Sequence, residues 1–188
     1  MLKTIKKWPF TSTAIMIFIL SALAFPAWAS GTKAIVYLSN KDFLKQSFNG
    51  DVPEVKTVWL KGTLKTDISK TLGHNYPALR VRYWLKDHRS AWILEEIGRE
   101  KPITVGFVVQ DQKLVSVKVL VFRENRGGEI RFPSFTEQFD GSELDNNRRL
   151  NRRIDGISGA TLSVNAVRKL AAVALQLSDH VMKQQTNK

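Results

Sequence analysis

The amino-acid sequence of 188 residues contains no cysteine. Disulfide bridges, cysteine-ligated metals, thiol catalysis and lipid attachment through a lipobox cysteine are therefore excluded. Histidine is also rare, and His74, His88 and His180 lie far apart in the chain and form no ligand motif with one another. The sequence therefore gives no support for a metal or haem centre.

Acidic residues are few, with 17 aspartates and glutamates against 29 lysines and arginines, which gives a formal net charge of +12. This excess of positive charge is typical of proteins that bind nucleic acid, an anionic membrane surface or an acidic protein. No serine-histidine-acid pattern, phosphate-binding glycine loop or dinucleotide fingerprint stands out, which argues against an enzyme that transfers hydride from its own nicotinamide. Pro/Ser-rich linkers, low-complexity tracts and internal repeats are missing too, and the length suits one compact domain.

The most apolar run lies near the N-terminus. A start with three lysines precedes apolar residues 14–25, and Ala27-Trp28-Ala29 has the small-x-small pattern of a signal-peptidase site. The run is short for a transmembrane helix of roughly 20 residues, and Pro26 interrupts it. We expect residues 1–29 to be a cleaved signal peptide and the mature chain, with a charge of +9, to lie in the periplasm, which argues against nucleic acid as a partner. The alternative is an uncleaved segment that anchors the chain in the inner membrane.

The pattern of apolar residues in the mature chain predicts an α+β fold. We expect strands over residues 79–85, 91–97, 103–109 and 114–122, and helices over residues 41–48, 58–72 and about 163–182. Consecutive short strands with tight connections indicate an antiparallel meander. The last helix is expected to cover one face of that sheet.

Residues 155–163 read Asp-Gly-Ile-Ser-Gly-Ala-Thr-Leu-Ser and lead directly into the last expected helix. Gly156 and Gly159 allow a tight bend, and Thr161 or Ser163 is expected at or near the N-cap. Unpaired backbone N–H groups and the positive end of the helix dipole favour a bound phosphate at such a place. The segment therefore predicts an anion site that contains a hydroxyl group, and an ordinary turn before a capped helix is the alternative.

This segment resembles the flavinylation motif of the FMN-binding domain family, which includes flavin-carrying subunits of the sodium-translocating NADH:quinone oxidoreductase and of the Rnf complex. Residues 122–130 and 135–139 are also similar to that family. The resemblance implies that Thr161 carries FMN through a phosphoester bond, which a periplasmic flavin transferase forms from FAD with a metal ion while AMP leaves. The cofactor-binding residues that it implies around Thr161 are Asp155, Gly156, Ser158, Gly159, Ala160, Leu162 and Ser163.

A polar loop follows the fourth expected strand, and the resemblance implies that it lies beside the isoalloxazine ring. Its candidate cofactor-binding residues are Arg123, Glu124, Arg126, Gly127 and Gly128. The two glycines would let the backbone approach a flat ring, and an arginine near the ring or the phosphate would stabilise an anionic reduced flavin. A solvated loop is the alternative.

Four arginines at positions 148–153 precede the motif, namely Arg148, Arg149, Arg152 and Arg153. They are interpreted as phosphate clamps, as a docking patch for an acidic electron-transfer partner, or as a solvated basic face. The sequence alone leaves these three interpretations open.

Taken with the resemblance, the sequence predicts an exported electron-transfer flavoprotein with covalent FMN on Thr161. We divide the chain into the signal peptide 1–29, an N-terminal extension of helix and strand over residues 30–90, and an FMN-binding domain over residues 91–188. Electrons would pass between a membrane-bound reductase and a periplasmic acceptor, so the chain is read as a redox carrier more than a free-standing enzyme. The alternatives are a small periplasmic flavin-dependent reductase that acts directly on a soluble acceptor, and a non-redox basic binding module.

Overall fold

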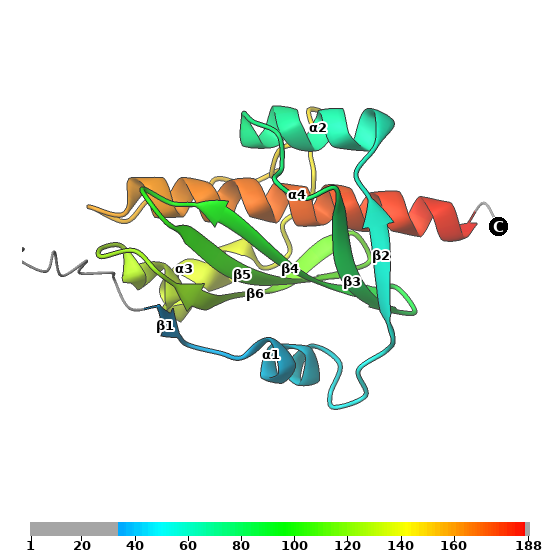
Figure 1. Ribbon diagram of the computed structural model, residues 1–188, viewed down its shortest axis with the longest axis horizontal. Coiled ribbons are helices and arrows are strands. Elements are labelled where there is room, and N and C mark those ends of the chain that lie inside the picture. The colour runs from blue at the N-terminus through cyan, green and yellow to red at the C-terminus, as the bar shows by residue number, and fades with distance from the viewer. Residues whose placement is uncertain (1–33, 187–188) are drawn as a thin grey trace, which may run out of the picture. The chain divides into compact units, whose positions relative to one another are not determined.

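The computed structural model describes residues 34–186, so the expected signal peptide over residues 1–29 lies outside the described residues. A six-stranded antiparallel sheet in the order β1-β6-β5-β4-β3-β2 forms its centre (Figure 1). The strands are β1 (Ile35–Val36), β2 (Val55–Trp59), β3 (Arg80–Lys86), β4 (Arg89–Ile97), β5 (Pro102–Gln110) and β6 (Lys113–Phe122). The helices are α1 (Asn40–Ser47), α2 (Gly62–Leu72), α3 (Pro133–Thr136) and α4 (Thr161–Thr186), with short 3-10 turns η1 (Gly128–Arg131) and η2 (Glu137–Phe139). Strands β2 to β6 neighbour one another in chain order, which confirms the predicted α+β fold with an antiparallel meander.

Helices cover both faces of the sheet. On one face, α4 packs against β4, β5 and β6, and α2 packs against α4. On the other face, Phe43 of α1 and the residue that follows α1, Phe48, form a second apolar cluster with Ala91 and Leu120. Ala91 and Trp92 are adjacent in β4 and belong to these different clusters, because successive side chains of a strand point to opposite faces.

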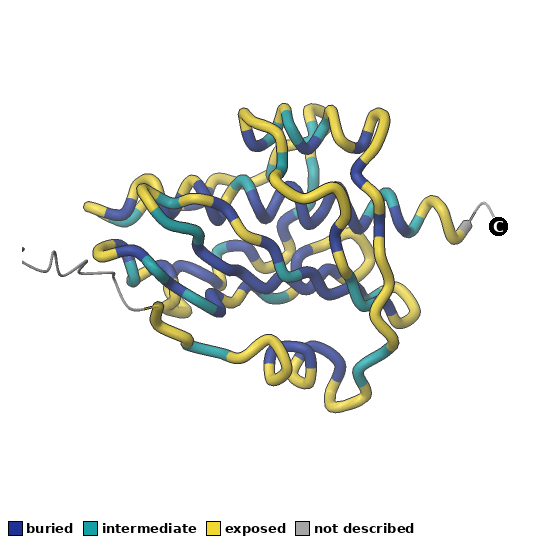
Figure 2. The backbone as a smooth tube through the Cα atoms, viewed as in Figure 1, coloured by how far each residue is buried: buried dark blue, intermediate teal, exposed yellow. Residues whose placement is uncertain are grey.

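The helix α4 is the main support of the fold. Its residues 170–178 are all buried, because the sheet covers one side of the helix and α2 and the neighbouring loops cover the other (Figure 2). The prediction of a C-terminal helix after the motif is confirmed, although the helix begins two residues earlier and ends later than expected. Among residues 34–186, no helix is both long enough and apolar enough to cross a bilayer.

The predicted helix over residues 58–72 was wrong at its start. Val58 and Trp59 belong to β2, where Val58 pairs with Val81 and Trp59 pairs with Arg80 of β3. Burial of Val58 and strand pairing outweigh the helical pattern that the sequence suggested. The helix α2 begins at Gly62 and is capped by Gly73, whose N–H donates to the carbonyl of Ser69 from a left-handed conformation with φ 84°. The sequence pattern also gave no indication of β1, of β2 or of the short helical turns between residues 128 and 139.

Gly106 in β5 makes room for α1. A Cβ atom at this position would lie 2.6–2.8 Å from three ring atoms of Phe43. The ring of Phe43 is buried, so α1 depends on the absence of a side chain at Gly106.

Candidate functional site

The motif forms the entry to α4. The N–H of Val164 donates to the carbonyl of Ala160 at 2.9 Å, so Thr161 is the first residue of the helix. Gly159 has φ 78°, a left-handed conformation that turns the chain into the helix, and the N–H of Ala160 donates to the carbonyl of Ile157. Thr161 is exposed, and the N–H groups of the first helical turn have no acceptor within the helix. The placement confirms the expectation of a hydroxyl near the start of this helix.

Two glycines hold the helix entry against neighbouring loops. A Cβ atom on Gly127 would lie 3.0 Å from Oγ of Ser163 and 3.1 Å from Cβ of Ala160. A Cβ atom on Gly98 would lie 3.4 Å from the same Ser163 oxygen. Ala160 and Ser163 are both buried. The structure therefore brings the predicted residues Gly127, Ala160 and Ser163 together, and it adds Gly98, which the sequence pattern did not indicate.

Glu124 organises the turn between β4 and β5. Its Oε1 accepts hydrogen bonds from the N–H groups of Arg99, Glu100 and Lys101 at 2.6–2.9 Å. Burial alone would raise the pKa of Glu124, but these three bonds and the charge of Arg99 outweigh it and hold the pKa below its ordinary value. The carboxylate therefore stabilises the turn that follows Gly98, and this turn forms one side of the site.

The other residues of the predicted loop lie elsewhere. Arg123 donates to the carbonyl of Pro102 and to Oγ1 of Thr104 and lies 3.6 Å from a carboxylate oxygen of Glu95. Thr104 follows Ile103 of the core facing α4, so this cluster lies on the opposite face of the sheet from α4. Arg126 is exposed.

Gly128 lies beside the residue that follows the first strand. A Cβ atom there would be 3.3 Å from the hydroxyl of Tyr37. That hydroxyl accepts from Arg131, whose guanidinium also stacks on the rings of Tyr37 and Phe132. Gly128 thus lets the loop pass close to Tyr37.

The outer part of the motif is open to solvent. Asp155, Gly156, Ser158, Gly159 and Leu162 are all exposed. The N–H of Asp155 donates to Oε1 of Gln138 at 2.7 Å, which joins the start of the motif to η2. The motif therefore has a fixed base and an accessible surface.

A groove with a volume of about 980 Å³ runs beside the first turns of α4. Its walls come from α4, the end of β4, α2 and the loop 145–150, and its lining includes Leu162, Asn165, Ala166, Lys169, Glu96, Ile97, Gly98, Asp67, Lys70, Thr71, Arg148, Arg149 and Leu150. Ile97 and Leu162 are two apolar lining side chains that stay more than half exposed. Thr161 directly precedes the lining residue Leu162 and lies one helical turn before the lining residue Asn165, so the start of α4 lies beside this groove.

The groove carries more positive than negative charge. Of its three carboxylates, Asp67 lies beside Arg148 and Glu96 beside His74, and Asp145 accepts hydrogen bonds from the N–H groups of Asn147 and Arg149. Among residues 34–186, no ion pair engages the cationic groups of Lys70, Arg149 and Arg168, which also line the groove. An anionic group in the groove would therefore meet unneutralised cations.

His74, shortly after α2, contacts Glu96, a residue that lines the groove. Its Nε2 lies 2.9 Å from Oε1 of Glu96, and its Nδ1 lies 2.9 Å from the carbonyl of Asn75. The hydrogen bond to the Asn75 carbonyl and the bond to Glu96 raise the pKa of His74 above its ordinary value, because both acceptors favour the doubly protonated ring. Lys169 lies nearby and donates to the carbonyl of Leu72 at 2.6 Å.

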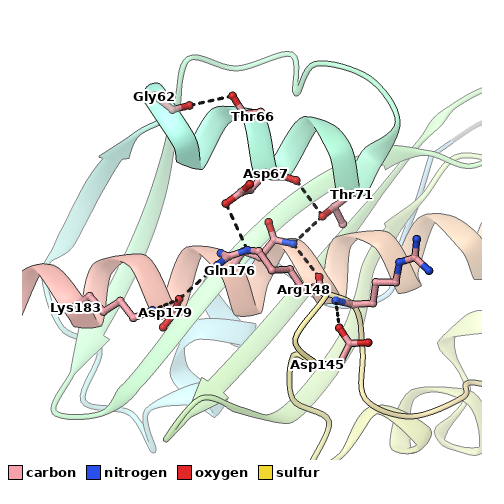
Figure 3. Close-up of polar contacts among 10 residues, drawn as sticks. Gly62, Thr66, Asp67, Thr71, Asp145, Arg148, Gln176, Asp179 and Lys183 are labelled. Carbon is pink, nitrogen blue, oxygen red and sulfur yellow. Dashed lines mark hydrogen bonds and ion pairs between the residues drawn. The ribbon is translucent and has the colours of Figure 1, made fainter.

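A partly buried polar network joins α2, α4 and the loop before the motif (Figure 3). The guanidinium of Arg148 lies 3.5 Å from Asp67 of α2 and 3.9 Å from Asp179 of α4. Gln176, fully buried in α4, donates to Oγ1 of Thr71 at 2.7 Å and to the carbonyl of Arg148 at 3.2 Å. Arg148 therefore holds the far wall of the groove together.

The remaining arginines before the motif have different surroundings. Arg152 donates to the carbonyl of Asp140 at 2.8 Å, and Arg153 lies 3.8 Å from Asp155 in a highly exposed pair. Arg149 lines the groove together with Arg148. The four arginines thus do not act as one patch.

A known family covers most of this region. The sequence profile of the FMN-binding domain matches residues 98–176, which run from Gly98 to Gln176 and include the loop 123–128, the motif and most of α4. The match supports the FMN-binding domain family for this part of the chain and a flavin-binding protein with FMN as the flavin. No curated protein matches the chain significantly.

The groove fits the chemistry of such a cofactor. Its volume is at the upper end of the roughly 300–1,000 Å³ typical of ligand pockets, and it combines apolar walls with unpaired cations. The exposed Thr161 lies in the first turn of α4, directly before the lining residue Leu162, and the free N–H groups of that turn favour a phosphate. The residues that sequence reasoning missed, Glu96, Ile97, Gly98 and the α2 side chains, carry no motif, and only tertiary packing brings them to Thr161.

Proposed function

We propose that this protein is an exported electron-transfer flavoprotein that carries FMN on the Oγ1 atom of Thr161. The observation that carries the proposal is the exposed Thr161, which begins α4 within the matched FMN-binding domain and directly precedes Leu162 of the cationic groove. A tether suits an exported protein, because a cofactor held only by noncovalent contacts would be lost outside the cytoplasm.

The chain's own residues would divide the work of holding the cofactor. The free N–H groups of the first turn of α4 would face the phosphate on Thr161. Ile97 and Leu162 offer apolar walls for a flat ring, while Lys70, Arg149 and Arg168 favour negative charge in the groove. When bound, FMN supplies one-electron and two-electron redox chemistry. The protein then needs no catalytic acid or base of its own.

Attachment would be a phosphoryl-type transfer. A new bond forms between Oγ1 of Thr161 and the phosphorus of the FMN half of FAD, the pyrophosphate bond breaks, and AMP leaves. The hydroxyl proton is lost to solvent or a base, and no electron is transferred. A periplasmic flavin transferase with a bound metal ion is the proposed catalyst, and the exposed residues 155, 156, 158 and 159 leave the motif accessible to it.

The proposed route places the mature chain in the periplasm, with a membrane-bound reductase as electron donor and a periplasmic carrier or substrate as acceptor. The expected signal peptide over residues 1–29 supports export. Retention of that segment as an inner-membrane anchor would leave the same domain on the same side of the membrane.

Co-production with an active flavin transferase tests the attachment. We expect a yellow chain whose colour survives denaturation and precipitation, and a mass gain of one FMN on the peptide that contains Thr161. Thr161→Ala should abolish both signals, whereas Ser163→Ala, which removes a buried hydroxyl two residues away, should keep them. Covalent colour that persists in Thr161→Ala would refute the assignment.

A direct flavin-dependent reductase is the second candidate, because the groove has unpaired cations that suit a small anionic acceptor. Turnover of such an acceptor by the purified yellow chain with a reduced mediator would favour it. Electron transfer that requires a partner protein would favour the carrier. A chain that stays colourless with an active transferase would leave the non-redox binding module.

A further inference from the structure

The two strands at one edge of the sheet carry cations and no carboxylate. Strands β2 and β3 read Val-Lys-Thr-Val-Trp and Arg-Val-Arg-Tyr-Trp-Leu-Lys. Lys86 is neutralised by Asp51 at 2.6 Å. Among residues 34–186, no ion pair engages Lys56, Arg80 or Arg82. The carboxylate closest in sequence to Lys56 is Glu54, directly before β2, and the one closest to Arg80 and Arg82 is Asp87, directly after β3.

The strand register places aromatic and basic side chains on one face. Trp59 pairs with Arg80, Thr57 with Arg82, and Val55 with Trp84. Directly opposed residues of antiparallel strands point to the same side of the sheet. Val58 and Val81, which alternate with them, face the core under α4, so this surface is the face away from α4. We call the exposed set Val55, Thr57, Trp59, Arg80 and Arg82 the β2–β3 face.

The β2–β3 face is uncovered in the part of the chain that the structure describes. The helix α1 lies on the same side of the sheet but packs on β4, β5 and β6 (Figure 1). Trp59 and Val55 are each 54% exposed, and Arg80 and Arg82 are exposed beside them. The guanidinium of Arg80 lies 5.7 Å from the centre of the Trp59 ring, which keeps the ring and the charge together.

We propose that the β2–β3 face docks on a bilayer surface with anionic phospholipid headgroups. Tryptophan prefers the boundary between headgroups and acyl chains, where its apolar ring and its N–H are both satisfied. The arginines beside it gain from the negative surface potential of anionic lipids. A flat face of this kind needs no pocket, and Val55 and Trp59 supply apolar area at its surface. The inference is independent of the proposed flavin.

The test uses residues 30–188, because residues 32–188 form a compact unit with its own core. The apolar N-terminal segment is left out because it would bind lipid by itself. Binding to vesicles of one part phosphatidylglycerol and two parts phosphatidylcholine is compared with binding to pure phosphatidylcholine vesicles. We expect binding only to the anionic vesicles, and weaker binding at high salt. The Arg80→Ser/Arg82→Ser double variant should weaken it roughly 30-fold, from the usual contribution of two basic residues.

Two controls separate this face from general basicity. Lys65→Ser/Lys70→Ser removes the same charge from exposed positions of α2, in the layer on the α4 side of the sheet, and should weaken binding far less. Lipids brominated near the headgroup should quench the fluorescence of the chain, and Trp59→Phe should remove most of that quenching, because Trp92 is fully buried and Trp84 is partly buried against the α1 cluster. Circular dichroism checks that each variant folds.

The proposal is overturned if the chain does not bind anionic vesicles, or if both double variants weaken binding equally. It is also overturned if binding occurs without quenching of Trp59. Binding to an acidic protein through Arg80 and Arg82 in the absence of vesicle binding would assign the face to a protein partner instead. None of these outcomes affects the colour test at Thr161.

Discussion

Substitution of Gly127 by alanine tests how closely the loop after β6 must approach the start of α4. Gly127 has φ 87°, a conformation that costs a residue with a Cβ atom about 1–2 kcal/mol. The added methyl would also lie 3.0 Å from Oγ of Ser163 and 3.1 Å from Cβ of Ala160, both buried. Crowding of this kind typically costs about 1–3 kcal/mol. We therefore expect Gly127→Ala to lower the free energy of unfolding by about 2–5 kcal/mol.

Gly141→Ala is the matched control. Gly141 also has a left-handed φ, 72°, but an added Cβ atom would meet nothing within 4 Å. Its expected cost is only the conformational part, about 1–2 kcal/mol. Urea unfolding followed by circular dichroism gives both values, and the difference between the two variants isolates the contact with the helix entry.

The same pair of variants has a second readout. Because Gly127 touches Ala160, crowding there should shift the residue before Thr161 and reduce covalent flavin in the presence of a transferase, whereas Gly141→Ala should leave the yield unchanged. Equal destabilisation and equal flavin content in the two variants would show that the close packing on Ser163 and Ala160 has no energetic importance.

Three further outcomes are expected. The pKa of His74 in the folded protein is raised above its unfolded value of 6.5, so its stabilising hydrogen bonds are present below pH 6.5 and are lost as pH rises through the folded pKa. His74→Gln should therefore lower the free energy of unfolding more in acid than in alkali, as measured by urea unfolding. An equal loss of stability at all pH values would contradict this. The pKa of Glu124 is lowered from 4.5 in the folded protein, so its stabilising effect is present above pH 4.5 and is lost as pH falls through the folded pKa. In Glu124→Gln the free energy of unfolding should therefore fall less steeply with decreasing pH in this acid range. Gly106→Ala should lower the free energy of unfolding by about 1–3 kcal/mol, because the added Cβ atom would crowd the Phe43 ring. In a double-mutant cycle Phe43→Leu should restore part of this loss, whereas additive losses would argue against crowding between the two residues.

The strands that the sequence predicted correctly are those with strong local signals. Residues of β4, β5 and β6 are rich in β-branched and aromatic side chains and are separated by short polar turns. β2 was missed because Val58 and Trp59 are followed by a segment with a helical pattern, and only pairing with β3 decides their conformation. β1 has two residues, too few for any pattern to be visible.

At the site, the sequence predicted the local geometry around Thr161 and little of its surroundings. The hydroxyl at the helix start follows from the glycine-containing turn and the periodicity of α4, which are properties of adjacent residues. Arg123 was interpreted as a residue near the cofactor, but its side chain makes no contact with the motif. It bonds to Thr104, on the face of the sheet opposite α4. The groove itself could not be predicted, because its walls come from four separate segments.

The far wall of the groove has a consequence for how this protein can be divided. α2, with Asp67, Lys70 and Thr71, and the ring of His74 all precede residue 98, where the family profile begins. A truncated fragment limited to residues 98–176 would keep Thr161 but lose β2, β3 and β4 together with the groove walls from α2 and the end of β4. If FMN is attached to Thr161 as proposed, a chimaera that swaps residues 55–97 should change the colour and the reduction potential while leaving the attachment reaction intact.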